Sequence, residues 1–218
     1  NSGADDILVR PYSVSFLAER VRTLVDARKG FVVTTEYIGP DRRKTSARPD
    51  SARLLDVPNT LRIKARPEET GAIDMKETMA LIREAQDKLG ELRLQGTALQ
   101  MRLLAYFGLK AAQEGTSLDK YVAPMSAFSR LLYDKLHASS DRAVATAVAE
   151  ILEAVASVMQ GENVLKSLSQ SIERAKVVHE RLSPERAPAE LEREFAHAVS
   201  RLGQREGRSL RERLVAAR

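Results

Sequence analysis

The stretch that decides the fold is residues 79–103, MALIREAQDKLGELRLQGTALQMRL, in which apolar residues recur at helical spacing. The residues of this seam lie three or four positions apart: Met79, Ile82, Ala85, Leu89, Leu92, Gly96, Leu99 and Leu103. Such a pattern is close to a sustained heptad seam, which indicates a long helix packed lengthwise against a partner. The sequence therefore predicts a helical interface formed by Leu89, Leu92, Leu99 and Leu103.

Two kinds of partner suit this seam equally well. The seam can form the core of an intramolecular helical bundle, or it can join two copies of the chain as a homodimer, because both arrangements bury the same stripe. Gly90 and Gly96 lie inside the pattern. A glycine in a helix interior costs about 1 kcal/mol relative to alanine, so we expect a bend or a close helix approach at these two positions.

The residues around the seam extend the helical prediction to the C-terminus. Asp74, three residues before Glu77, resembles a capping box at the start of the long helix. Breaks follow at 115–117, at 139–141, at Gly161 and at 183–184, and two shorter, charged helices are expected at 188–202 and 209–217. Residues 73–218 are therefore predicted to be mainly α, either a bundle of long antiparallel helices or a dimerisation region built from them.

Composition narrows the class of function. The absence of cysteine excludes a disulfide framework, thiol catalysis and a thiolate metal site, and it fits a reducing compartment, so we expect a cytoplasmic protein. No apolar run is long enough to span a membrane. The histidines His137, His179 and His197 lack the spacing of a helical zinc site, so no metal is expected. Motifs of enzymes, such as a phosphate loop or a hydrolase elbow, are missing, and we expect no catalysis.

The first 72 residues are organised differently from the rest. Ile7-Leu8-Val9, ended by Arg10-Pro11, is a short apolar run that predicts a strand buried on both faces. From Ser13 to about Arg28 the apolar residues take helical spacing, with Ser13 or Ser15 as the N-cap. Residues 30–72 contain four of the eight prolines and predict an extended basic linker, with a short extended piece at 31–35.

Residues 3–13, Gly-Ala-Asp-Asp-Ile-Leu-Val-Arg-Pro-Tyr-Ser, and the helix after them resemble the end of a bacterial response-regulator receiver domain. In that family the last strand and helix typically read Gly-Ala-Asp-Asp-aromatic, two apolar residues, and then Lys-Pro-aromatic-Ser. The segments 36–43 and 57–62 are similar to the extension that follows the receiver in some alphaproteobacterial regulators. The receiver motif covers about a seventh of the chain.

This resemblance implies that residues 1–29 are the C-terminal strand and helix of a doubly wound receiver domain, and that the helical region 73–218 is an output or dimerisation region. The phosphoacceptor aspartate, and the acidic pocket that holds Mg²⁺ in a complete domain, would lie upstream of Asn1, and the missing initiator methionine fits that expectation. Arg10 and Pro11 would lie on the active-site edge, with Pro11 after a cis peptide bond. Arg10 replaces the family's lysine and Ile7 replaces its aromatic residue, and both departures argue against ordinary phosphorylation switching.

The resemblance further implies a phosphorelay signalling protein that acts by protein–protein recognition, with a sensor kinase or phosphotransfer protein as partner and no cofactor in these residues. One alternative is a nucleic-acid-binding regulator that uses basic residues at 42–53 and 201–213. Another is a phosphotransfer bundle, because residues 179–184 look like the phosphoacceptor box of sensor kinases with two residues in reversed order. Otherwise His179 is expected to be a solvent-facing residue near a helix end.

Overall fold

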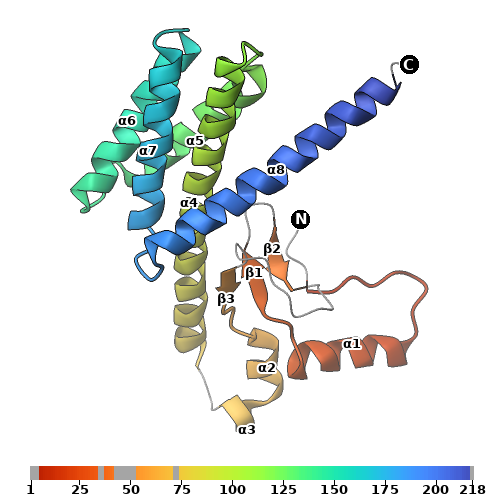
Figure 1. Cartoon of the computed structure of the whole chain (residues 1–218). Helices are drawn as coiled ribbons and strands as arrows, with labels where there is room; N and C mark the ends of the chain where they lie inside the picture. The colour runs from red at the N-terminus through yellow and green to blue at the C-terminus, as the bar shows by residue number, and fades with distance from the viewer. Residues whose placement is uncertain (1–4, 34–36, 42–52, 71–73, 217–218) are drawn as a thin grey trace. The chain divides into compact units, whose positions relative to one another are not determined.

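The structure, a computed structural model, describes residues 5–33, 37–41, 53–70 and 74–216, and for residues 53, 70 and 205–216 it describes the backbone alone. The described chain is mainly helical (Figure 1), which confirms the predicted fold class. It divides into two compact units, Asn1–Arg93 and Leu94–Arg218. The division falls inside one long helix, α4 (Met75–Gln113), and not before it at residue 72 as the sequence suggests.

The first unit begins with helix α1 (Val14–Asp26), which the sequence predicts correctly. The hydroxyl of Ser13 accepts a hydrogen bond from the backbone N–H of Phe16 at 3.1 Å, so Ser13 is the N-cap. At the other end, the N–H of Ala27 donates to the carbonyl of Thr23 and closes the last turn. Local capping chemistry therefore determines both ends of this helix.

A small antiparallel sheet follows α1, in the order β2-β1-β3. Its strands are β1 (Phe31–Val33), β2 (Ile38–Pro40) and β3 (Arg53–Leu55). In β1, Val33 pairs with Ile38 on one side and with Arg53 on the other. Two short helices then lead towards α4: α2 (Thr60–Ala65) and α3 (Pro67–Thr70).

The prediction of an extended linker at 30–72 is thus wrong for much of its described length. Val33, Leu55 and Leu92 form a buried cluster, against which Phe31, Ile38, Val57 and Leu89 pack. The sheet folds because it covers the apolar side chains of Leu89 and Leu92 on α4, and burial of that surface stabilises both partners. Of the strands and short helices observed in this region, the sequence predicts only the extended piece at Phe31–Val33.

The predicted buried strand at Ile7–Val9 is also wrong. These residues form no strand, and the side chains of Ile7 and Val9 are 65% and 76% exposed. A strand buried on both faces needs neighbouring strands that accept and donate backbone hydrogen bonds. Within the described part of the chain, no strand pairs with residues 7–9.

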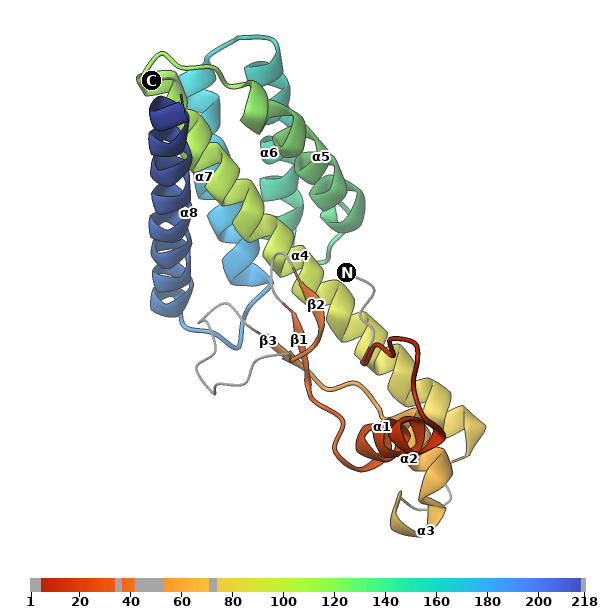
Figure 2. The ribbon, with the colours of Figure 1, turned by 90° about the vertical axis from the view of Figure 1, so that its right-hand side faces the viewer.

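The second unit is a bundle of α4 and the helices that follow it (Figures 1 and 2). Its further helices are α5 (Asp119–Leu136), α6 (Arg142–Met159), α7 (Val164–Arg181) and α8 (Pro188–Ala216). Short turns reverse the chain so that α6 packs against both α5 and α7. Met101, Met125, Leu132, Ile151 and Leu168 are each at most 1% exposed and fill the centre of this core.

The predicted breaks between these helices are confirmed. Asp141 caps α6, its carboxylate accepting hydrogen bonds from the N–H groups of Ala143 at 2.9 Å and Val144 at 3.4 Å. Gly161, at φ 74°, follows the end of α6 in the left-handed conformation that glycine adopts without strain. The two short helices expected after residue 188 form one helix instead, because the glycines at 203 and 207 weaken a helix without ending it.

The close helix approach occurs at Gly108 and not at the expected glycines. A Cβ atom at Gly90 or Gly96 would meet nothing within 4 Å. A Cβ atom at Gly108 would lie 3.3 Å from Cδ2 of Leu168 and 3.8 Å from Cβ of Tyr121. Gly108 therefore allows α4 to lie close to side chains of both α5 and α7.

The apolar seam of α4 is shared between the two units. Leu92 belongs to the cluster beneath the sheet and Leu89 packs against it, whereas Leu99 and Leu103 belong to the core of the bundle. Leu92, Leu99 and Leu103 are each at most 7% exposed. An intramolecular core therefore accounts for these three residues, and they are not accessible to a second copy of the folded chain.

Two glycine substitutions on α4 are expected to have opposite effects on the free energy of unfolding of the second unit. Gly96→Ala should raise it by about 0.5–1 kcal/mol, because alanine favours the helix and its Cβ meets open space. Gly108→Val should lower it by about 1–3 kcal/mol through overpacking against Leu168 and Tyr121. Urea unfolding followed by circular dichroism measures both, and an unchanged midpoint for Gly108→Val would contradict the close approach.

Candidate functional site

The predicted site residues do not form a single site. Arg10 and Pro11 lie in an exposed loop of the first unit and are joined by a cis peptide bond, as expected. His179 lies on α7 in the second unit, where its side chain is 1% exposed. The four seam leucines are divided between two cores.

The burial of His179 contradicts its expected position facing solvent. Ser171, Ala175 and Val178 are buried on the same helix, at spacings that place His179 on the same apolar stripe. A phosphoacceptor histidine must be reached by the active site of another protein, so its burial argues against phosphotransfer through His179. The helical spacing of Ala175, Val178 and His179 was a signal in the sequence for this burial.

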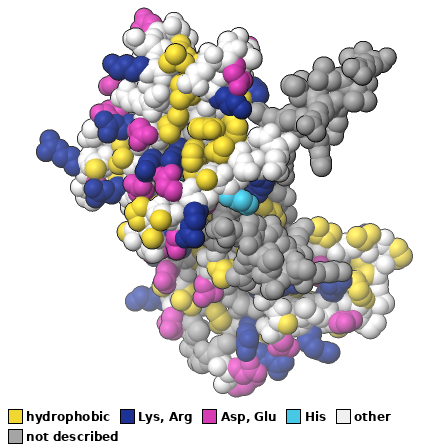
Figure 3. Space-filling model, in the orientation of Figure 1, with side chains coloured by type: hydrophobic (Ala, Val, Ile, Leu, Met, Phe, Trp, Pro, Cys, Tyr) yellow, Lys and Arg dark blue, Asp and Glu magenta, His cyan; other side chains and the backbone are white. Residues whose placement is uncertain are grey.

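The loop before α1 and the helix itself expose a group of apolar side chains, here called the α1 surface. It consists of Ile7, Val9, Tyr12, Val14, Phe16, Leu17 and Val21. Val14 is 84% exposed, and every other member is exposed by more than a third. In the space-filling view, hydrophobic side chains gather over this part of the chain (Figure 3). Clustered apolar exposure of this kind marks an interaction site more often than scattered single residues do.

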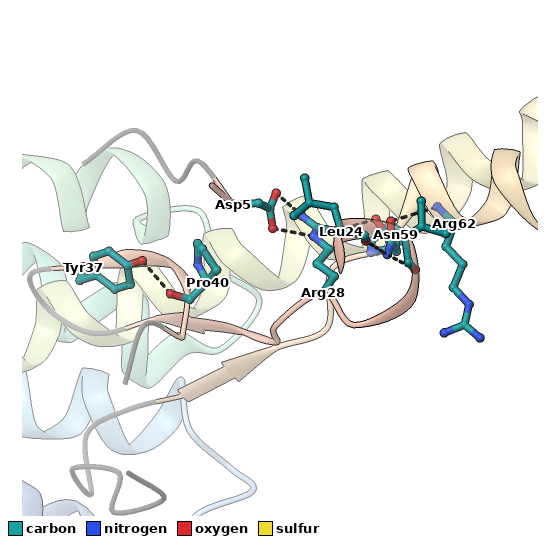
Figure 4. Close-up of polar contacts among 9 residues, drawn as sticks. Asp5, Leu24, Arg28, Tyr37, Pro40, Asn59 and Arg62 are labelled. Atoms are coloured by element: carbon teal, nitrogen blue, oxygen red, sulfur yellow. Dashed lines mark hydrogen bonds and ion pairs between the residues drawn. The ribbon is translucent and has the colours of Figure 1, made fainter. Parts of the chain in front are cut away.

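Asn59 connects the end of α1 to the start of α2 (Figure 4). Its Nδ2 donates to the carbonyl oxygens of Leu24 at 2.8 Å and Val25 at 3.3 Å, which lie in the last turn of α1. Its Oδ1 accepts from the N–H of Arg62 at 3.1 Å and so caps α2. One side-chain amide thus satisfies backbone groups that two helix ends leave without helical partners.

Arg28 makes a second connection beside the first. Its Nε and Nη2 donate to the two carboxylate oxygens of Asp5 at 2.7 and 3.1 Å, and its Nη1 donates to the carbonyl of Pro58 at 3.2 Å. The guanidinium lies over the ring of Phe31, 4.8 Å from its centroid. A two-pronged contact of this type holds planar groups in a fixed orientation, so Arg28 ties the N-terminal loop to α1 and to the segment before α2.

A pocket of about 470 Å³ lies next to these two residues within the first unit. Its wall is mostly apolar and includes Leu24 of α1, Phe31 and Leu55 of the sheet, and Ala85 and Leu89 of α4. Asp5, Arg28 and Asn59 supply polar groups at its wall. Both the size and this mixture of many apolar groups with few polar ones are typical of small-molecule sites.

In the second unit, a buried arginine ties the beginning of α8 to α4. Arg102, whose side chain is 7% exposed, donates from Nη2 to Oε2 of Glu192 at 2.8 Å. Its guanidinium lies 3.8 Å from the ring centroid of Phe195. Lys176 of α7 reaches Oε1 of the same carboxylate at 3.1 Å. The cluster has a structural role: its acidic and basic side chains pair with one another and so hold α4, α7 and α8 together.

The charges around Glu192 change the acidity of its carboxyl group. The hydrogen bond from Arg102 lowers the pKa of Glu192 below its usual value of 4.5, and Lys176 adds to this effect, while burial acts in the opposite direction. The net shift is downward, so the folded protein favours the ionised carboxylate that binds both cations.

Arg28 and Asn59 were not predicted as site residues. The sequence pattern places Arg28 at the end of a predicted helix and Asn59 in a predicted linker. An asparagine directly before Thr60-Leu61-Arg62 is a recognisable N-cap signal for a short helix. Nothing in the sequence indicates its second contact with α1, which spans 35 residues along the chain.

The two basic segments predicted as a possible nucleic-acid-binding surface, 42–53 and 201–213, are only partly described. Arg42, Arg43, Lys44 and Arg48 lie outside the described residues, and so do the side chains of Arg53 and of the basic residues after 204. Among the residues that the structure does describe, no cluster of three or more histidine or acidic side chains is arranged for a metal ion. Across the same residues, no helix combines the length and apolar character needed to cross a membrane.

Neither protein-family models, nor curated proteins, nor solved structures gave a match to this chain.

Two substitutions of Asn59 should separate its two roles. Asn59→Ala removes both contacts and should lower the free energy of unfolding of the first unit by about 2 kcal/mol. Asn59→Asp keeps an acceptor for the N–H of Arg62 but cannot donate to Leu24 and Val25. Amide hydrogen exchange should show Arg62 protected in Asn59→Asp and unprotected in Asn59→Ala.

Asn163 provides the control for these variants, because it caps α7 without a side-chain hydrogen bond and at φ 45°. Asn163→Gly should leave the stability of the chain nearly unchanged. Equal protection of Arg62 in both Asn59 variants would show that Asn59 does not cap α2.

Stability of the second unit should depend on pH through Glu192. Its pKa is lowered on folding, so its stabilising contribution is present above the usual value of 4.5 and is lost as the pH falls through the lower folded value. Glu192→Gln should therefore reduce the loss of stability on acidification, measured as urea midpoints between neutral pH and about pH 3. Glu153→Gln, at an exposed position of α6, is the control and should keep the slope of the unaltered protein.

Proposed function

We propose that this chain is part of a bacterial response regulator and acts in phosphorelay signal transduction by protein–protein interaction. In this proposal, residues 1–29 supply the C-terminal segment of a receiver domain, whose strand forms only when the rest of the sheet is present, and the helical region 73–218 is the output region. The protein works in the cytoplasm, without catalysis of its own in these residues. Its partners are a sensor kinase or a phosphotransfer protein, and Mg²⁺ binds only where the receiver is complete.

The observation that carries the proposal is the exposure of the α1 surface. In a doubly wound domain, the last strand lies within a sheet and the last helix packs against that sheet, so both present apolar side chains to the rest of the domain. Here the residues that resemble this strand and helix keep that apolar pattern, and Ile7, Val9 and Val14 are largely exposed. A receiver sheet placed against the α1 surface would cover these side chains.

The two ion pairs at the N-terminal loop support the same assignment. Asp5 binds Arg28, and Oδ2 of Asp6 lies 3.3 Å from Nη1 of Arg20. They hold the loop along α1, so the segment before Arg10 already runs beside the helix that follows it. That is the order of elements that the receiver motif requires.

The second unit is suited to output because it buries its own core. Twenty side chains of α4 to α7 form one buried cluster, and α8 is tied to it through Arg102 and Glu192. A unit that buries its own core can behave as a rigid domain when the receiver changes its state. Nucleic-acid binding remains a prediction from the sequence, because most of the basic side chains behind it, all but Arg201, lie outside the described residues.

Hydrogen exchange tests the receiver proposal. We expect the protein isolated from its source cells to have a larger intact mass than this chain, with upstream residues that complete a receiver. In that longer protein, amides of Val14–Asp26 should exchange more slowly than in residues 1–218 alone, because the sheet covers the α1 surface.

Amides of α6, buried in the other unit, serve as the internal control and should exchange equally in both proteins. An intact mass that matches this chain, or α1 exchange that does not change when upstream residues are present, would overturn the proposal.

A further inference from the structure

We propose that the first unit binds a single-tailed anionic amphiphile, such as a medium-chain fatty acid, with its tail in the apolar pocket and its carboxylate beside Arg28 and Lys29. Asp5, Asp6 and Ile7 line part of this site and also belong to the segment assigned to the receiver, but binding by residues 1–218 can be tested without a complete receiver. The proposal rests on two hollows that meet at one ion pair, on the charge of the second hollow, and on the apolar wall of the first.

The apolar pocket of about 470 Å³ is bounded by α1, the sheet, α2 and α4. Of its lining residues, Leu55 belongs to the buried cluster with Val33 and Leu92, and Phe31 and Leu89 pack against that cluster. A hydrocarbon tail there would extend an existing core and remove further apolar surface from water. A polar ligand would gain little from this wall.

A second hollow of about 370 Å³ adjoins the first, since Asp5, Leu24 and Arg28 line both. Among its described lining residues, Arg20, Arg28 and Lys29 are cationic, whereas Asp5 and Asp6 are anionic. The two carboxylates pair with Arg28 at 2.7 Å and with Arg20 at 3.3 Å. The hollow therefore has one positive charge in excess, which favours an anionic group over a neutral or cationic one.

The carboxylate of the ligand would compete with Asp5 for the guanidinium of Arg28. A carboxylate accepts two parallel hydrogen bonds from a guanidinium, and Asp5 already shows that this geometry fits Arg28. Asp5 lies in a loop, with its side chain 27% exposed, so it can be released into water when the ligand takes its place. An amphiphile that joins an apolar tail to one carboxylate matches both hollows together.

Calorimetric titration of the full chain with decanoate and octanoate, below the concentrations at which they form micelles, tests the proposal. Decanoate should bind saturably, with one molecule per chain. Each methylene group buried is worth about fourfold in affinity, so decanoate should bind on the order of tenfold more tightly than octanoate. Decanol, which has the same tail without the charge, should bind several times more weakly than decanoate.

Two variants locate the site. Ala85→Phe places a large side chain in the tail pocket and should abolish binding, and Lys29→Gln should weaken decanoate binding severalfold without affecting decanol. Thr146→Phe and Lys135→Gln, both at exposed positions of the second unit, are the matched controls and should bind as the unaltered chain does. Circular dichroism establishes that each variant is folded.

Saturable binding with the expected dependence on tail length, charge and Ala85 supports the proposal. It is overturned by the absence of saturable binding, by equal affinities for octanoate and decanoate, or by unchanged binding in a folded Ala85→Phe variant. Equal affinities for decanol and decanoate would also overturn it, because the proposal requires an anionic head group. The comparison of ligands needs no variant, so it remains decisive if Ala85→Phe fails to fold.

Discussion

The apolar stripe along α4 is the constraint on which both units depend. The stripe runs through residues 79–103 of a helix of 39 residues, and most of the stability of such a helix comes from packing and not from the helix itself. Leu89 and Leu92 are covered by the three-stranded sheet, and Leu99 and Leu103 by neighbouring helices. The sheet is therefore required by the first part of α4, which explains why residues that carry few signals of regular structure still fold around it.

Polar side chains then fix how the elements of each unit are joined. In the first unit, Asn59 and Arg28 connect α1 to the segment that begins α2. In the second, Arg102 and Glu192 connect α4 to α8. Apolar contacts tolerate sliding, whereas a buried donor without its acceptor costs free energy. These contacts are thus better suited to specifying one arrangement than to supplying stability, because removing charges from water offsets much of what their pairing contributes.

Helices could be predicted from the sequence much better than the sheet, because their signals are local. Ser13, Asp74 and Asp141 each accept a hydrogen bond from a backbone N–H two or three residues away, so the capping residue and its partner are read together. The strands are only three residues long, and Ile38-Gly39-Pro40 has no alternating pattern to recognise. The run at Ile7–Val9 illustrates the opposite error: apolar residues show a need for burial, but they do not show that a neighbouring strand is present.

The candidate site was only partly predictable for a related reason. Arg10 and Pro11 belong to a contiguous motif, whereas Arg28 meets Asp5 across 23 residues and Asn59 meets Leu24 across 35. Such contacts depend on the fold, and the spacing of residues along the sequence does not reveal them. Among the described residues, the two units also differ in the size of their buried clusters: twenty side chains form the core of the bundle, and Val33, Leu55 and Leu92 form the cluster beneath the sheet. Because apolar burial stabilises roughly in proportion to area, a sheet against the α1 surface or a tail in the apolar pocket would add proportionally more to the first unit than to the second.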